Sequence, residues 1–226
     1  MKTHAVLATL ALTTLTLHAL DWPQYRGATL DGKTTEKIAK PWPAAGPKVL
    51  WKAETPGGFS SFTVAGGHAF TLVLREIDGA AQETLLALDA KTGKEAWAAA
   101  LGPVKFDGGG DSGTPENSGG DGPRSTPTSD GAHVFTLSSK LVLQAFEAAS
   151  GKVAWTKDLI AEHAGQNIKW QSAASPLLEG GMLFVAGGGA GQSLLAIDPK
   201  DGKVVWKAFD EKMTHATTVP DRKSVV

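Results

Sequence analysis

The sequence contains no cysteine. A chain without cysteine has no disulfide bond, no thiolate metal site, no cysteine nucleophile and no Cys-x-x-Cys-His motif for covalent haem attachment. The sequence also lacks an excess of positive or negative charge, because the net charge is only −1 over 226 residues. This balance gives none of the basic excess that nucleic acids or anionic membrane surfaces attract. We therefore predict no nucleic-acid partner.

A long uncharged apolar run occurs in one place, between Ala5 and Leu17, directly after the positive Lys2. The run is too short for a typical membrane span, and Ala19 is a suitable residue before a cleavage site. Residues 1–20 are therefore predicted to be a secretory signal peptide. We expect the mature domain, residues 21–226, to be periplasmic or secreted, without a transmembrane anchor after cleavage.

Tryptophan is abundant, with seven residues beside a single tyrosine. Three of them end segments that align without gaps, namely Ala87–Trp97, Ala145–Trp155 and Ala196–Trp206. Each segment has alanine first, an acidic residue two positions later, then Gly-Lys, and tryptophan at its eleventh position. Three copies in register predict a repeat protein.

Each copy is typical of a β-hairpin. An apolar strand leads into the acidic residue, which can accept backbone N–H bonds in the turn, and the glycine provides the positive φ that a tight turn needs. A second hairpin signal precedes each copy. Four-stranded units recurring at this spacing indicate propeller blades, here at about residues 60–100, 125–157 and 173–208. The predicted fold is all-β, a partial β-propeller of antiparallel four-stranded blades.

The motif resembles the repeat of pyrroloquinoline-quinone-type (PQQ-type) propellers, Ala-x-Asp-x-x-Thr-Gly-x-x-x-Trp, which occurs once per blade. The first copy matches fully, the second has glutamate and serine in the acidic and hydroxyl positions, and the third has aspartate in the hydroxyl position. The resemblance covers nearly all of residues 21–219 and implies that the tryptophans pack between blades. The implied docking residues are Asp89, Gly93, Trp97, Glu147, Gly151, Trp155, Asp198, Gly202 and Trp206.

Three blades do not make a ring, since propellers close with about 4–8 blades. A fourth blade is expected to start near His215, shortly before the sequence ends. We expect the chain to be a truncated part of a ring of about 7–8 blades, because open blade edges promote aggregation. The alternative is a half-propeller that is completed by dimerisation.

The residues just before the first strand of each blade are candidate ligand-binding residues, because that strand lines the central channel of a propeller. They are Phe59, Arg124, Trp170 and His215, and they would lie around the funnel mouth. Two aromatic rings, a guanidinium and an imidazole can hold a flat anionic ligand, such as a quinone carboxylate, or a peptide. Ordinary rim residues are the alternative interpretation.

Two glycine-rich segments match functional motifs more weakly. The acidic loop at residues 107–123 is interpreted as a solvated loop, with a Ca²⁺ site as the alternative. Residues 27–34 fit the phosphate-binding P-loop pattern, but no buried strand precedes them and Pro41 follows closely. No catalytic residue and no metal ligand is predicted.

Two functions remain open. The favoured one is a non-catalytic binding or scaffold module in the cell envelope with protein or peptide partners, as in the outer-membrane assembly scaffold that shares this repeat. The alternative is a fragment of a PQQ-dependent dehydrogenase, for which the resemblance implies PQQ and Ca²⁺ as cofactors. The residues themselves predict no cofactor, and the cysteine pair frequent in those enzymes is absent.

Overall fold

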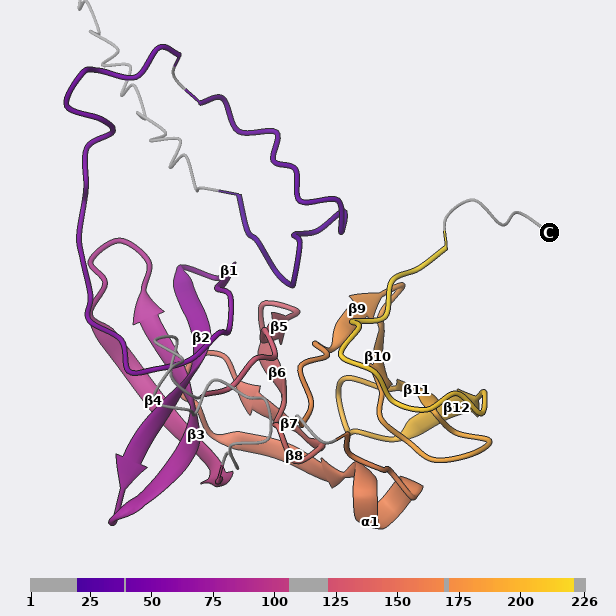
Figure 1. Cartoon of the computed structure of the whole chain (residues 1–226). Coiled ribbons are helices and arrows are strands. Elements are labelled where there is room, and N and C mark those ends of the chain that lie inside the picture. The colour runs from indigo at the N-terminus through magenta and orange to yellow at the C-terminus, as the bar shows by residue number, and fades with distance from the viewer. Residues whose placement is uncertain (1–19, 39, 106–121, 169–170, 222–226) are drawn as a thin grey trace, which may run out of the picture.

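The computed structural model describes residues 20–38, 40–105, 122–168 and 171–221. It contains three four-stranded antiparallel sheets, each with its strands in simple sequence order, arranged one after another (Figure 1). This confirms the predicted partial β-propeller. Blade one consists of β1 (Thr63–Ala65), β2 (His68–Ile77), β3 (Ala80–Asp89) and β4 (Glu95–Pro103); blade two of β5 (Thr128–Ser129), β6 (His133–Leu137), β7 (Val142–Glu147) and β8 (Val153–Asp158); blade three of β9 (Leu177–Glu179), β10 (Met182–Ala186), β11 (Leu194–Ile197) and β12 (Val204–Ala208).

The repeated alanine and tryptophan face each other across the two outer strands of every blade. The pairs are Ala87 with Trp97, Ala145 with Trp155 and Ala196 with Trp206, and the register shifts immediately after the alanine in all three sheets. A small side chain opposite an indole leaves room for the ring, and the irregularity increases the local twist of the strand. The repeat therefore sets the local geometry of each outer hairpin.

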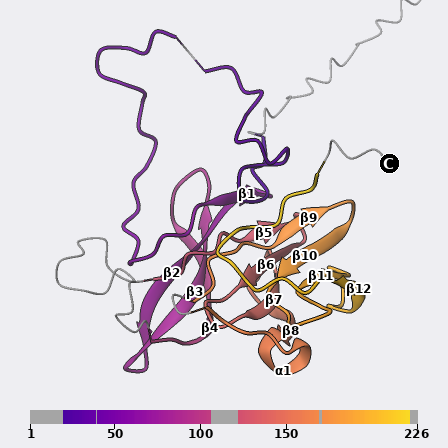
Figure 2. The same ribbon diagram turned by 45° about the vertical axis from the view of Figure 1, so that its right-hand side comes forward.

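The hydrophobic core lies between neighbouring sheets. One cluster joins Phe70 and Leu85 of blade one to Val134 and Phe146 of blade two, and Trp97 packs against it. A second cluster joins blades two and three through Phe135, Leu143, Leu183 and Ile197. Figure 2 shows the sheets side by side and turned relative to one another. Each blade thus buries its apolar faces against the next blade, as a propeller requires.

A single helical turn, α1 (Leu159–His163), follows blade two. Asp158 is its N-cap, and one carboxylate oxygen accepts the backbone N–H groups of Ile160 and Ala161. Leu159 is fully buried. The sequence analysis did not predict this turn, because the repeat motif indicates strands alone and the capping residue Asp158 is itself the last residue of β8.

Several predicted segments lie at the edges of the described structure. Residues 1–19 of the predicted signal peptide and residues 106–121 of the acidic loop lie outside the described residues. Residues 34–38 and 40–50 form an arm that stands away from the sheets (Figures 1 and 2). The described residues after β12 form no strand, and the fourth blade stays a prediction. No helix in the described part of the chain is long and apolar enough to cross a membrane.

Candidate functional site

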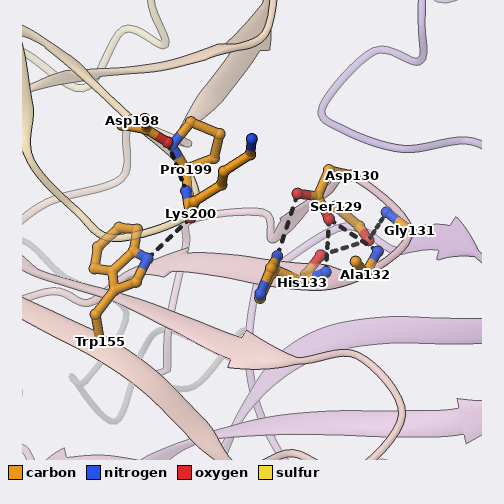
Figure 3. A network of polar contacts seen from close by, with 9 residues as sticks. All are labelled: Ser129, Asp130, Gly131, Ala132, His133, Trp155, Asp198, Pro199 and Lys200. Carbon is orange, nitrogen blue, oxygen red and sulfur yellow. Dashed lines mark hydrogen bonds and ion pairs between the residues drawn. The ribbon is translucent and has the colours of Figure 1, made fainter.

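Each blade receives a tryptophan from the segment that precedes it in the chain. The indole N–H groups of Trp51, Trp97 and Trp155 donate to the carbonyl oxygens of Ala90, Ala148 and Pro199, at 3.0, 3.1 and 2.9 Å. These three carbonyls occupy the same position, directly after the acidic residue of the repeat. Figure 3 shows the third bond, with the indole of Trp155 pointing at the turn that contains Asp198. The bond therefore joins successive units along the chain.

The glycine of the repeat lies under the docked indole. A Cβ atom added to Gly93, Gly151 or Gly202 would lie 2.4, 2.5 or 2.9 Å from the ring of the tryptophan that docks there. All three glycines also have positive φ, between 69° and 74°. A side chain is thus excluded by close contact as well as by backbone conformation.

The acidic residue of the repeat holds the docking turn. In the first copy, one oxygen of Asp89 accepts the backbone N–H groups of Lys91 and Thr92 and the hydroxyl of Thr92. The hydrogen bond from the Thr92 hydroxyl is the main cause that lowers the pKa of Asp89 below its ordinary value. Glu147 instead accepts from the Ser150 hydroxyl, and Asp198 accepts from the Lys200 N–H. These residues form turns, and the docking face offers no reactive group from the repeat.

Trp206 ends the series. Its side chain packs on Phe184 with ring centroids 5.7 Å apart, yet the residue is 39% exposed. Within the described residues its indole N–H has no acceptor. Trp206 thus differs from the three docked tryptophans, because no turn among the described residues accepts a hydrogen bond from its indole.

At the opposite end of the first strands, hydroxyl groups link the blades. The N–H of Ser61 donates to the Thr126 hydroxyl, the N–H of Thr126 to the Ser175 hydroxyl, and the N–H of Ser175 to the Thr217 hydroxyl, at 3.3, 2.9 and 3.0 Å. We call these four residues the hydroxyl series. The series fixes which positions of successive blades are equivalent, and it extends to the segment expected to begin a fourth blade.

A hollow of about 420 Å³ lies at this end of the blades. It brings together three of the four predicted mouth residues, Phe59, Arg124 and His215. The Arg124 guanidinium carbon lies 5.8 Å from the centroid of the Phe59 ring, within the range of a cation–π contact. The fourth, Trp170, lies outside the described residues, and the hydroxyl series places Ala173 at the position equivalent to Arg124.

The sequence analysis missed Tyr25, which lines the same hollow. It comes from the N-terminal segment, before any blade. The one available signal was that this segment is rich in aromatic residues although it precedes the repeats. Nothing in the repeat spacing could have assigned it to the channel.

The two candidate cofactors, Ca²⁺ and PQQ, require different residues around the hollow. The described lining contains no carboxylate, and in the described ranges no group of three His, Asp or Glu side chains could hold a metal. Ca²⁺ takes six or more oxygen ligands, usually including carboxylates. The lining therefore does not fit Ca²⁺, whereas Arg124, Phe59 and Tyr25 suit an aromatic carboxylate such as PQQ.

One carboxyl group is deeply buried between blades one and two. Glu83 is only 2% exposed, and both of its oxygens face the backbone N–H of Ser139, at 3.3 and 3.0 Å. Burial is the main cause that raises the pKa of this carboxyl, and the Ser139 hydrogen bonds oppose the rise. Glu83 does not line the hollow, and its environment indicates a role in the contact between blades.

Comparison with known proteins bears on the fold. The chain is similar to quinohemoprotein alcohol dehydrogenase from Comamonas testosteroni, at 18% identity and a TM-score of 0.59, over 84% of this chain and 27% of that chain. It is also similar to BamB from Moraxella catarrhalis, at 18% identity and a TM-score of 0.41, over 63% of this chain and 33% of that chain. The chain thus spans about a third or less of these proteins. A comparison with curated proteins found no match.

The likeness to the dehydrogenase exceeds a TM-score of 0.5 and supports the propeller fold alone. A family model described as "Outer membrane protein assembly factor BamB" matches residues 81–226. This range includes all three copies of the docking motif and well over half of the chain. The chain therefore belongs to the PQQ-like propeller repeat family described as outer membrane protein assembly factor BamB.

Proposed function

We propose that this chain belongs to an exported propeller that acts as a non-catalytic binding or scaffold module in the cell envelope. The observation that carries the proposal is the composition of the hollow at the funnel mouth. A guanidinium, an imidazole and two aromatic rings line it, and its described lining has no carboxylate. Such a surface suits an acidic group of a partner protein.

The geometry of Arg124 supports this binding role. Its guanidinium lies over the Phe59 ring, which restricts its position. A guanidinium carries its N–H donors in one plane, a geometry that matches the two oxygens of a carboxylate. An acidic side chain or a chain terminus that carries an apolar group would therefore contact both parts of the pair.

Location in the envelope rests on the sequence and on the family. The predicted signal peptide would export the chain, and the matching family is described as an outer membrane assembly factor. Protein partners follow from the same description.

A fragment of a PQQ-dependent dehydrogenase is the second candidate, favoured by the likeness to the quinohemoprotein alcohol dehydrogenase. Arg124 would hold a carboxylate of PQQ, and Phe59 or Tyr25 would lie against its rings. When bound, PQQ accepts electrons from an alcohol. The lack of carboxylates in the described lining disfavours the Ca²⁺ that would accompany it.

The test is a binding measurement on the full chain with a short fluorescent peptide that ends in Phe with a free carboxylate. We expect binding that weakens about tenfold or more in Arg124→Gln, since a hydrogen bond to a charged group is lost. Lys152→Gln removes the same charge from a docking turn and is the control, expected to bind as the parent does. Equal binding by the parent and Arg124→Gln would contradict the proposal.

A second experiment separates the two candidates. PQQ and Ca²⁺ are added to the full chain, and the cofactor's absorbance and the reduction of a dye by added alcohol are followed. No turnover is expected. Stoichiometric PQQ binding with dye reduction would overturn the non-catalytic role and establish the dehydrogenase.

A further inference from the structure

The N-terminal segment Asp21–Leu30, which we call the strap, crosses the first strands of all three blades. Successive strap residues contact successive blades. The bonds are Trp22 N–H to Val64 O at 2.8 Å, Val64 N–H to Trp22 O at 2.9 Å, Ser129 N–H to Pro23 O at 2.8 Å, and Leu178 N–H to Gln24 Oε1 at 2.9 Å. The strap thus binds the inner edge of each blade at one point.

The three contact points on the blades are equivalent positions. Val64, Ser129 and Leu178 each lie three residues after a member of the hydroxyl series. Three residues of extended strand span about 10 Å. The strap therefore crosses the blades about 10 Å beyond the hydroxyl series, on the side away from the mouth. The next strap residue, Tyr25, lines the hollow.

The strap has a defined structure of its own. Gly27 donates its N–H to the carbonyl of Gln24 and has a φ of 81°. An added Cβ at Gly27 would lie 2.9 Å from the ring of Trp22, so the strap folds back on its own indole. Gln24 is 4% exposed and Leu30 9%. This turn includes the start of the P-loop-like segment and explains Gly27 without a phosphate.

The strap also satisfies the inner edge of the sheets. The first strand of a blade has a free edge towards the channel, where a buried N–H without an acceptor is costly. The strap supplies acceptors for the N–H groups of Val64, Ser129 and Leu178. At the equivalent position after the third blade stands Pro220, which has no N–H to satisfy. The strap therefore provides an acceptor at each of the three equivalent positions that has a backbone N–H, and none is needed at Pro220.

We propose that the strap closes the floor of the hollow along these three blades, so that the hollow is a blind pocket for the end of an extended chain, with Tyr25 as one of its binding residues. This deepens the proposed function and rests on it. A closed floor stops an extended chain that enters the hollow between these blades. A free C-terminal carboxylate would reach Arg124, and the last side chain would lie between the rings of Phe59 and Tyr25.

The closure is tested by hydrogen exchange of the backbone amides of Val64, Ser129 and Leu178 in the full chain. We expect slow exchange in the parent, and exchange at least about tenfold faster in Gly27→Ala, where the new methyl displaces the Trp22 ring. Gly32→Ala is the matched control, because Gly32 has a φ of 73° and no atom within 4 Å of an added Cβ. Fast exchange in the parent, or no effect of Gly27→Ala, would overturn the closure.

A milder pair of variants guards against misfolding of Gly27→Ala. Gln24→Leu removes the acceptor for the Leu178 N–H, whereas Gln24→Glu keeps an acceptor oxygen at that place. Only the leucine variant should speed exchange at Leu178. If both variants exchange alike, the side-chain contact does not hold the strap.

The role of the pocket is tested with three peptides of one sequence ending in Phe: a free acid, a C-terminal amide and a head-to-tail cyclic form. The free acid should bind about tenfold tighter than the amide, and the cyclic form should not bind. Tyr25→Ala should weaken binding of the acid about threefold to tenfold, and Tyr25→Phe should retain it.

The outcomes separate the two proposals. Equal binding of acid, amide and cyclic peptide would overturn the blind pocket and leave a binding module that recognises side chains. No binding of any of them would overturn the proposed function and the role of Tyr25, while the exchange data would still decide whether the strap closes the floor of the hollow.

Discussion

The indole N–H of Trp97 donates to the carbonyl oxygen of Ala148, which lies 51 residues further along the chain in the turn of the next blade. The same relationship joins Trp51 to Ala90 and Trp155 to Pro199. The repeat therefore encodes contacts between units more than contacts within them. Because stability in such a protein depends on neighbouring units, changes at the docking turns should act on the whole array.

Gly151→Ala should be more destabilising than an ordinary glycine replacement. The positive φ of 72° costs an alanine about 1–2 kcal/mol. The new Cβ would also lie 2.5 Å from the Trp97 ring, which adds about 1–3 kcal/mol of overpacking. Urea unfolding followed by tryptophan fluorescence measures the sum.

Gly191→Ala is the control for that experiment. Gly191 has the same φ of 72°, and no atom lies within 4 Å of an added Cβ. Gly191→Ala should therefore lose only the free energy that the positive φ costs an alanine. Equal losses for the two variants would mean that the indole moves aside without cost.

Trp97→Phe should destabilise the chain by about 1–3 kcal/mol, because the Ala148 carbonyl loses its donor and the smaller ring leaves a gap between blades. Trp206→Phe is the comparison, since this indole has no acceptor among the described residues and is 39% exposed. It should cost under about 1 kcal/mol. Thermal unfolding of both variants gives the difference, and a larger loss at Trp206 would contradict the assignment of docking to the first three tryptophans.

The fold could be predicted from the sequence because the repeat carries its own register. Alanine opposite tryptophan, acid in the turn and glycine under the indole recur in each copy, so one interpretation accounts for all three blades. The strap could not be predicted, since its contacts are a few hydrogen bonds that Trp22, Pro23 and Gln24 form with distant strands. Such bonds leave no spacing pattern in the sequence, and Tyr25 was missed for that reason.

The residues predicted at the funnel mouth also show where prediction from the sequence loses accuracy. Phe59, Arg124 and His215 were predicted from their positions before the expected first strands, and the three residues line one hollow. In the third blade, the sequence analysis predicted Trp170 at the mouth. The hydroxyl series instead places Ala173 at the position equivalent to Arg124, three residues later. Loops that lead into blades vary in length, so counting back from a motif loses accuracy where no hydrogen bond fixes the register.

Thr128→Val should destabilise the contact between blades two and three. The Thr128 hydroxyl is fully buried and donates to the Pro176 carbonyl at 2.6 Å. Valine keeps the shape and leaves that carbonyl without its donor, at a cost of about 1–3 kcal/mol.

Thr136→Val provides the matched control in the same blade. The Thr136 hydroxyl is equally buried and has no hydrogen-bond partner in the part of the chain that the structure describes. Replacing an unsatisfied hydroxyl by a methyl should be neutral or stabilising. Denaturant unfolding of both variants tests the pair, and the interpretation is wrong if Thr136→Val proves the more damaging.

The buried carboxyl of Glu83 should make stability fall as the pH rises. Its pKa is raised above the ordinary 4.5 mainly by burial, so between pH 4.5 and the raised value the folded state binds more protons than the unfolded state. The free energy of unfolding therefore decreases through that window and stays lower above it. Glu83→Gln keeps an acceptor for the Ser139 N–H and removes the titration, so its stability relative to the parent should grow as the pH rises from 4.5 through the raised pKa of Glu83.

Glu95 provides a control of opposite sign. Its hydrogen bond from Arg75 lowers its pKa below the ordinary 4.5, so its contribution is present above pH 4.5 and is lost as the pH falls through the lowered value. Glu95→Gln should therefore be less stable than the parent at neutral pH, and this difference should shrink in acid. Urea unfolding of the three proteins across this pH range measures both effects. If Glu83→Gln and the parent respond to pH alike, Glu83 is charged in the folded protein without penalty, and burial between the blades does not control its protonation.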